Sequence, residues 1–403
     1  MAKRFKSGEW DLIEAELERD PAHYGLPEGG REESVVLASF NIRKLGSPGS
    51  RKREIDFMAR FCARCDLVAI QEVQDRLDGL HELKARVDER VSSAGEYGLV
   101  VSDITGETPG KRGMAERLAF LYRHSRVRRT DMVSDLTVDR SGMLQNFEAS
   151  EEAIVAAWKE HHEKMAAFEA GTRKTKPTFR LPDFLTFTRT PHVCAFEVPG
   201  KGGKSIQFIA VNAHLLYGSQ AERDAEFRAL VAWMVNRLKA EKRMVAPNFI
   251  LLGDLNLNFD NPVKDRPVTQ EFLRGLNKTV FGRAARRVYF PFIDPYPPTG
   301  KEHRSNARMN QTFDQIAFLR GANEKSLPTH RWREGAGKKP DGFDFQVFRF
   351  TDLFAKALRG KEVKRLSSAD RTFIFEHCEN SVSDHMPIWV RVPRPGFRPP
   401  PSV

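Results

Sequence analysis

The chain has 403 residues, of which 40% are hydrophobic, and its 65 Lys and Arg against 54 Asp and Glu give a formal charge of +11. Such a chain can bury a sizeable core in one large domain or two ordinary ones. The basic balance favours a polyanionic partner, either nucleic acid or an anionic lipid surface. No apolar run in the sequence approaches the roughly 20 residues that span a bilayer. The first ten residues are too polar for a secretory signal, so we expect a cytoplasmic protein.

Apolar runs and amphipathic segments alternate along the chain in order. Strands are predicted at 35–41, 67–73, 97–102, 118–122, 193–198, 205–214, within 248–258, at 312–319 and after residue 385. Helices are predicted at 53–64, 77–91, 151–170, 219–240 and 268–277. Because strands with helices between them continue throughout, the predicted fold class is α/β, with two sheets packed face to face and helices outside.

Composition divides the chain further. Residues 1–33 are predicted to be an N-terminal extension, 34–392 the main domain and 393–403 a Pro-rich tail. Within the domain, 135–189 is interpreted as an insertion with one helix and a basic loop. The region 281–340 holds 12 Lys and Arg against 5 Asp and Glu, mixed with aromatic residues. This mixture suits a nucleic-acid groove, although a polar surface over a small satellite core is the alternative.

The four cysteines are few for this length, so disulfides are not expected to hold the fold. Cys62 and Cys65 have the spacing of a zinc or redox pair, but the sequence has no second close pair. Both continue an apolar helical face that begins at Ile55. The sequence therefore predicts buried core thiols.

The stretch 248–258, Asn-Phe-Ile-Leu-Leu-Gly-Asp-Leu-Asn-Leu-Asn, is the most informative one. Four apolar residues predict a buried central strand, and Gly253 permits a sharp change of backbone direction at its end. Asp254 and Asn256 are therefore expected at a strand tip. There they could orient a water and hold a phosphoryl oxygen or a hydrated cation, as phosphodiester hydrolysis requires. A strand followed by an Asx-turn is the structural alternative.

Other predicted strands end in polar side chains in the same way. Such residues lie at or beside the ends of apolar strands, namely Asn41, Glu72, His214, Asp254, Asn256, Asp384 and His385. Each alone suits a cap, a turn or a solvated edge. Gathered at one sheet rim, they would carry repulsion and desolvation costs that a structural site has no reason to bear, and a divalent cation would relieve those costs.

Six motifs in chain order resemble the endonuclease/exonuclease/phosphatase superfamily, which includes deoxyribonuclease I and the exonuclease III type of repair enzyme. They are Ser-Phe-Asn41-Ile-Arg, Ala-Ile-Gln-Glu72-Val, Asn-Ala-His214-Leu, Leu-Leu-Gly-Asp254-Leu-Asn256, Phe-Asp314-Gln-Ile and Ser-Asp384-His385-Met-Pro. The resemblance covers about residues 34–392. It implies a four-layered α/β sandwich, with two packed mixed β-sheets flanked by helices, to which this chain adds a helical insertion.

The resemblance also implies a role for each motif residue. Asn41, Glu72 and Asp384 would belong to the metal region, with Glu72 as the main ligand. Asp254 would orient or deprotonate the attacking water beside Asn256, and His214 would contact the phosphate. Asp314 would hold His385, which would stabilise or protonate the charge that develops on phosphorus. Oxygen ligands select a hard cation, so Mg²⁺ is expected, with Mn²⁺ as a substitute.

The predicted function is that of a Mg²⁺-dependent phosphodiesterase acting as a nuclease, with an endonuclease and DNA favoured over an exonuclease and RNA. Residues that could contact the substrate are Arg112, Arg117, Tyr217, Arg223, Arg331 and Arg333. A phosphatase or phospholipid phosphodiesterase of the same superfamily is the first alternative. A nucleic-acid-binding module without catalysis is the second. The chain lacks the Trp-Cys-Asp-Arg segment of the inositol-polyphosphate phosphatases and the Pro-Asn loop of the abasic-site enzymes.

Overall fold

The computed structural model describes the whole chain with the exception of certain segments. These are 1–3, 47–51, 107–114, 138–139, 178, 180–185, 219, 258, 260, 284, 286, 296–300, 325, 328–344 and 398–403.

Two six-stranded mixed sheets form the centre of the molecule. The first has the spatial order β11 (Phe345–Val347), β12 (Ile388–Pro393), β1 (Ser34–Leu45), β2 (Leu67–Val73), β4 (Arg117–Arg123) and β3 (Tyr97–Val101). The second has the order β5 (Arg128–Asp135), β6 (His192–Pro199), β7 (Ser205–His214), β8 (Phe249–Asp254), β10 (Asp314–Leu319) and β9 (Val288–Tyr289). The β1–β2 and β7–β8 pairs are parallel, and their flanking neighbours are antiparallel.

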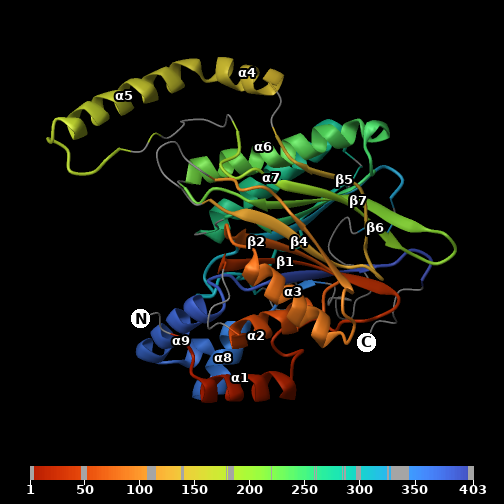
Figure 1. The fold of residues 1–403 in the computed structure, drawn as a ribbon. Helices are drawn as coiled ribbons and strands as arrows, with labels where there is room; N and C mark the ends of the chain where they lie inside the picture. Colours follow the sequence, from red (N-terminus) through yellow and green to blue (C-terminus); the bar gives the residue numbers. More distant parts are fainter. Residues whose placement is uncertain are drawn as a thin grey trace.

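Helices cover the outer face of each sheet, which makes four layers (Figure 1). The first sheet is covered by α2 (Lys52–Cys62), α3 (Asp78–Arg90), α8 (Phe350–Arg359) and α9 (Ser368–Ser381), and α1 (Ser7–Arg19) packs against α2 and α8. The second is covered by α6 (Gln220–Lys239) and α7 (Pro262–Phe281). The helices α4 (Arg140–Ala149) and α5 (Glu151–Glu169) project from the body beyond α6. Two short 3₁₀ turns, Glu241–Arg243 and Val363–Arg365, complete the described helical elements.

Strand β8 shows why its sequence is continuously apolar. Ile250 and Leu252 point into the core between the two sheets, whereas Phe249 and Leu251 point into the core under α6 and α7. Both faces of the strand are therefore buried, and no polar alternation is possible before the strand ends. Asp254 continues the inward row of Ile250 and Leu252, so its side chain faces the space between the sheets.

A buried polar network joins the two sheets below that point. The Gln71 side-chain amide donates to Asn212 Oδ1 at 2.7 Å, and Asn212 Nδ2 donates to the carbonyl oxygens of Ile70 and Ala119 at 3.0 and 2.9 Å. Buried polar groups without hydrogen-bond partners would destabilise the fold more than apolar side chains in their place. These hydrogen bonds therefore favour one position of the first sheet relative to the second. The rims of the two sheets are thus held opposite each other.

The predicted fold class and its four layers are confirmed. The four cysteines are buried and free, which confirms the buried thiols predicted for Cys62 and Cys65. The structure adds elements that the pattern did not predict, chiefly β5, α4, α8 and α9. It also extends the helix predicted at 268–277 to Pro262–Phe281, with Pro at its first position, where no backbone N–H is needed.

Helix α1 buries Trp10, Ile13 and Leu17 in the same core as the first sheet. The predicted division of the chain at residues 33 and 392 remains a prediction. No helix in the described part of the chain is both long and apolar enough to cross a membrane.

Candidate active site

Three adjacent strands of the second sheet place one row of side chains at their rim. His214 at the end of β7 pairs with Asp254 at the end of β8, and Asp254 pairs with Asp314 at the start of β10. Directly paired residues on neighbouring strands point to the same face, so these three side chains converge between the sheets. The row depends on close strand packing, since a Cβ on Gly253 would lie 1.9 Å from the carbonyl oxygen of Ala213.

The first sheet presents Asn41 and Glu72 to the same space. The register of β1 on β2 shifts just after Asn41, and that of β2 on β4 shifts just after Ile70. Glu72 has a φ of 60°, which a residue with a side chain adopts only when the surrounding structure imposes it. These bulges turn Asn41 and Glu72 toward the second sheet.

Asp254 contacts residues from both sheets. Its Oδ2 accepts a hydrogen bond from Asn41 Nδ2 at 3.0 Å. The Nε2 atoms of His214 and His385 lie 3.5 and 3.4 Å from the same oxygen. The other carboxylate oxygen, Oδ1, accepts the backbone N–H of Asn256 at 3.0 Å. One buried carboxylate is therefore surrounded by donors from four separate segments of the chain.

Asn256 orients the loop that follows Asp254. It has a φ of 49°, and its Nδ2 donates to the carbonyl oxygen of Leu215 at 2.7 Å. This bond joins the loop after β8 to the loop after β7. The structure thus places Asn256 beside Asp254, as predicted, with its amide engaged by the backbone.

Each imidazole is bound at its other ring nitrogen by a buried carboxyl group. His385 Nδ1 lies 2.9 Å from Asp314 Oδ2, and His214 Nδ1 lies 2.5 Å from Glu116 Oε1. The Asp314–His385 pair is the one that the family resemblance implied. The Glu116–His214 pair was not predicted.

The two pairs differ in protonation. Burial alone would lower the pKa of His385, but the carboxylates of Asp254, Asp314 and Asp384 raise it well above 6.5, so His385 is an imidazolium at neutral pH. Burial lowers the pKa of His214 to about 4 and raises the pKa of Glu116 to about 7. Below a pH of about 7 both groups of the Glu116–His214 pair are therefore neutral, so that Glu116 donates to Nδ1 and the N–H at Nε2 faces Asp254.

Glu116 stands just before the first residue of β4, whereas the residues predicted for the site follow the ends of strands. Because β4 is antiparallel to β2, its beginning lies at the rim where β2 ends. An acidic residue at the start of a strand that follows a predicted rim strand would have been the signal. Arg189, which is 1% exposed, lies behind the pair with its Nε 3.4 Å from Glu116 Oε2.

Two groups of oxygen and nitrogen atoms could hold a cation. The Oδ1 of Asn41 is buried and has no hydrogen-bond partner, and Asn41 Nδ2 lies 3.4 Å from the Glu72 carboxylate. Asp254, Asp314 and His385 form the second group, with ligand atoms within 4.8 Å of one another. An imidazolium carries a proton on the nitrogen that would bind metal, so the first group is the better ligand set. Asp384 immediately precedes His385 in the sequence, and its Oδ2 lies 3.8 Å from Arg43 Nε.

The residues expected to contact substrate have different surroundings. Tyr217 is 64% exposed, and its ring meets Phe313 edge-on at 6.0 Å, while Phe313 lies against the His385 ring. Arg223 is buried and donates to the carbonyl oxygen of Gly218. Arg117 donates to Asp103 and to the carbonyl oxygen of Ser102. Three further candidates, Arg112, Arg331 and Arg333, lie outside the described residues.

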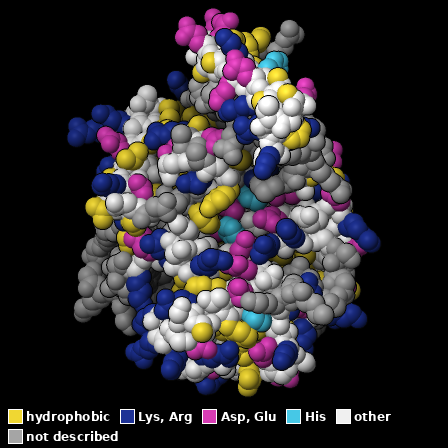
Figure 2. Space-filling model, turned by 90° about the vertical axis from the view of Figure 1, so that its left-hand side faces the viewer, with side chains coloured by type: hydrophobic (Ala, Val, Ile, Leu, Met, Phe, Trp, Pro, Cys, Tyr) yellow, Lys and Arg dark blue, Asp and Glu magenta, His cyan; other side chains and the backbone are white. Residues whose placement is uncertain are grey.

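The face that contains the site is shown in Figure 2. Histidine and acidic side chains gather near its middle, in a hollow bordered by Lys and Arg side chains. The end of the α4–α5 projection stands above this hollow (Figures 1 and 2).

No family model matches the sequence, and no curated protein matches it. Solved structures are similar over most of the chain. The human Nocturnin catalytic domain with bound sulfate is 11% identical, with a TM-score of 0.42, and the match covers 90% of this chain and 94% of that one. TDP2 from D. rerio, complexed with a single-strand DNA product, is 14% identical, with a TM-score of 0.40 over 89% and 98% of the two chains.

An endonuclease/exonuclease/phosphatase protein from Beutenbergia cavernae is 9% identical, with a TM-score of 0.38 over 90% and 72% of the two chains. The name of this last structure is that of the superfamily whose motifs the sequence resembles.

Proposed function

We propose that the protein is a divalent-metal-dependent phosphodiesterase that cleaves nucleic acid, and that it acts as an endonuclease on DNA. One observation carries the proposal. Asp254 Oδ2 lies at the convergence of an imidazolium, a neutral imidazole and a buried amide, each held in place by a second partner. The same donors line the space beside Asp254, where they would stabilise the charge that develops on a phosphoryl oxygen.

The residues support a division of roles. Asp254 accepts the proton of the attacking water, because it is the acceptor at the centre of the site. His385 carries positive charge toward the phosphoryl oxygens or the leaving oxygen, since Asp314 and Asp254 keep it protonated. His214 presents its Nε2–H to a phosphoryl oxygen. The P–O bond to the leaving group breaks as the water oxygen bonds to phosphorus, and no covalent intermediate is needed.

Asn41 and Glu72 fit a hard cation, because they offer an unpartnered amide oxygen and a carboxylate at the same rim. Asp384 is the third ligand that we assign. Mg²⁺ is the expected ion, and when bound it would polarise the phosphoryl group. The nucleic-acid assignment is supported by the formal charge of +11 and by the basic border of the site face.

The test compares purified protein with its Asp254→Asn variant on supercoiled plasmid, single-stranded DNA and RNA, with Mg²⁺ and with EDTA. We expect cleavage that requires the metal and a loss of about 10²-fold or more in the variant, the scale of a positioned general base. Asp131→Asn on the exposed strand β5 is the matched control and should cleave as the wild type does. Circular dichroism should show both variants folded.

Wild-type turnover by Asp254→Asn would refute the role given to Asp254. Release of phosphate from monoesters without cleavage of any polymer would instead identify a phosphatase and refute the nuclease assignment. Absence of turnover on all of these substrates, together with strand binding, would identify a non-catalytic binding protein.

A further inference from the structure

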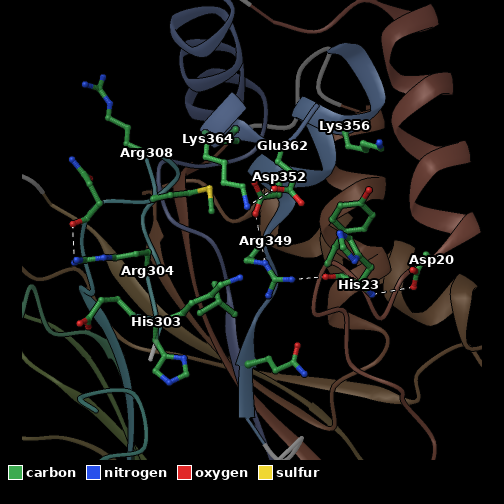
Figure 3. A pocket seen from close by; sticks show the side chains of 18 of the residues that line it. Asp20, His23, His303, Arg304, Arg308, Arg349, Asp352, Lys356, Glu362 and Lys364 are labelled. Carbon is green, nitrogen blue, oxygen red and sulfur yellow. Dashed lines mark hydrogen bonds and ion pairs between the residues drawn. The ribbon is translucent and has the colours of Figure 1, made fainter. Parts of the chain in front are cut away.

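A second cavity, of about 1350 Å³, opens beside the active site and has no role in the mechanism above. Its walls come from the turn after α1, the loop 301–310, strand β11, and helices α8 and α9 (Figure 3). It is thus built jointly by the N-terminal residues and by segments about 300 positions further along the chain.

The acidic residues of the cavity already have cationic or backbone partners. Asp352 lies 3.6 Å from Arg349, and Glu362 lies 2.8 Å from Lys364. Glu302 is bound by Arg266, which lies outside the cavity. These carboxylates therefore do not neutralise the remaining cations of the wall.

Three cations of the wall make no ion pair within 4 Å with any described residue. Arg304, Lys356 and Arg371 donate only to backbone carbonyl oxygens, at 2.9, 3.2 and 3.4 Å respectively. Arg304 is partly buried, and burial lowers its pKa by more than the charge of Glu302 raises it, because the cation loses hydration. A negatively charged ligand would compensate for that loss.

Part of the wall is apolar as well. Met309, Phe345, Val347, Val363 and Phe375 line the cavity among the charged residues. A ligand that places phosphate groups against guanidinium and ammonium groups, and a flat ring against apolar side chains, would satisfy both kinds of surface. A nucleotide unit has this composition, whereas inorganic phosphate offers no apolar part.

One loop separates the cavity from the active site and belongs to both. Asn306 forms a β-bridge with His385, and the backbone N–H of Ala307 donates to the carbonyl oxygen of Asp384 at 2.7 Å. Arg304, Arg308 and Asn310 of the same loop line the cavity. The charge of Asp384 also contributes to raising the pKa of Arg308, so this end of the cavity lies near the candidate metal ligands.

We infer that this cavity binds nucleotides of the substrate strand next to the phosphodiester that is cut. Their phosphates contact Arg304, Lys356 and Arg371, and a base packs on the apolar wall around Phe375. The identity of the ligand as a nucleic-acid strand rests on the proposed function. The inference adds a second contact region, outside the rim residues, that is formed by the loop 301–310 and by helices α8 and α9.

The test measures binding of a fluorescein-labelled single-stranded oligonucleotide by anisotropy, with the full chain in EDTA, so that its outcome does not depend on catalysis. The test variant is Lys356→Gln/Arg371→Gln. The control is Lys361→Gln/Arg365→Gln, which removes the same charge from exposed positions near α8 and outside the cavity wall. Both variants keep the buried faces of α8 and α9, so they should fold.

Each phosphate contact on a single strand contributes about −0.7 to the slope of log K against log[salt]. Loss of two contacts should therefore make the slope shallower by about 1.4 and weaken binding about 20-fold at 0.1 M salt. The control should differ from the wild type by less than about threefold, the effect of general charge alone. In Mg²⁺, hydrolysis of bis(p-nitrophenyl) phosphate should be equal in all three proteins, because this small diester does not reach the cavity.

Equal strand binding by the test and control variants would overturn the inference, as would a wild type that does not bind the strand. Displacement of the strand from the wild type by inorganic triphosphate at similar affinity would assign the cavity to small polyphosphates and also overturn it. A wild type that binds the strand through these residues but cleaves nothing in Mg²⁺ would refute the proposed function and leave the binding site standing.

Discussion

Gly253 offers a direct test of how strand packing holds the active site. In Gly253→Ala the new Cβ would lie 1.9 Å from the carbonyl oxygen of Ala213, and 2.8 and 2.9 Å from its carbonyl carbon and nitrogen. All three are backbone atoms of β7, which cannot rotate away as a side chain can. To restore a contact of at least about 3 Å, the two strands must separate by roughly 1 Å.

The cost of this separation can be estimated. Overpacking a core by one methyl group costs about 1 to 3 kcal/mol, and the rigidity of the backbone places this site near the upper value. With about 2.1 cal/mol/K of unfolding entropy per residue over 403 residues, a loss of about 3 kcal/mol lowers Tm by about 3 to 4 °C. The same movement changes the 3.5 Å distance between His214 Nε2 and Asp254 Oδ2. A misplacement of about 1 Å in a catalytic group can cost about 10²-fold in rate.

The assays are thermal unfolding by differential scanning calorimetry and cleavage of bis(p-nitrophenyl) phosphate in Mg²⁺. Gly275→Ala is the matched control, because Gly275 lies in helix α7 with no atom within 4 Å of its added Cβ. Alanine is the better helix former, so this control should be as stable as the wild type or more stable by up to about 1 kcal/mol. A Gly253→Ala protein with wild-type Tm and activity would refute the reasoning that close β7–β8 packing positions the site.

Three further predictions concern the polar groups of the site, each checked by steady-state hydrolysis of the same diester. Asp314→Asn removes a carboxylate that raises the pKa of His385, so His385 should lose its proton at a lower pH. The alkaline limb of the pH–rate profile should therefore move to lower pH, and an unmoved limb would contradict the Asp314–His385 pairing. In the wild type, Glu116 ionises as pH rises through about 7 and ceases to donate to His214. Glu116→Gln keeps a donor at every pH, so its hydrolysis rate should stay constant across pH 7. Glu116→Ala removes the donor, and its hydrolysis rate should fall at least about tenfold. A Gln variant that declines across pH 7 as the wild type does would refute the neutral pair. Glu72→Gln should raise the Mg²⁺ concentration needed for half-maximal rate, because an amide is a weaker ligand for a hard cation; an unchanged metal titration would place the ion elsewhere.

Much of the fold could be predicted from the sequence, because burial leaves a local pattern. The run Phe249 to Leu252 is apolar throughout since both faces of β8 are covered, one by the other sheet and one by α6 and α7. The polar residues that follow such runs marked the rim. For the same reason, Asn41, Glu72, His214 and Asp254 could be proposed as site residues from strand ends alone.

The pairing of those residues was decided by tertiary structure. Glu116 meets His214 at a sequence separation of 98, because antiparallel β4 returns its first residues to the rim where β2 ends. The alternation of side chains reports which face of a strand is buried, but it does not report which strands become neighbours. Strand order depends on how all of the apolar faces can be covered together, and this is a property of the whole chain.

The second cavity illustrates the same limit. Its walls include Asp20 after α1, Arg304 in the loop beside the site and Arg371 on α9, and no local pattern relates these positions. They meet because α1 buries Trp10 and Leu17 against the core that α8 also covers.

The sequence by itself determined which residues are apolar enough to be buried and which polar ones interrupt them. Only the tertiary structure decided which charges face one another, because charge pairing follows from the packing of apolar surfaces that lie far apart in the chain.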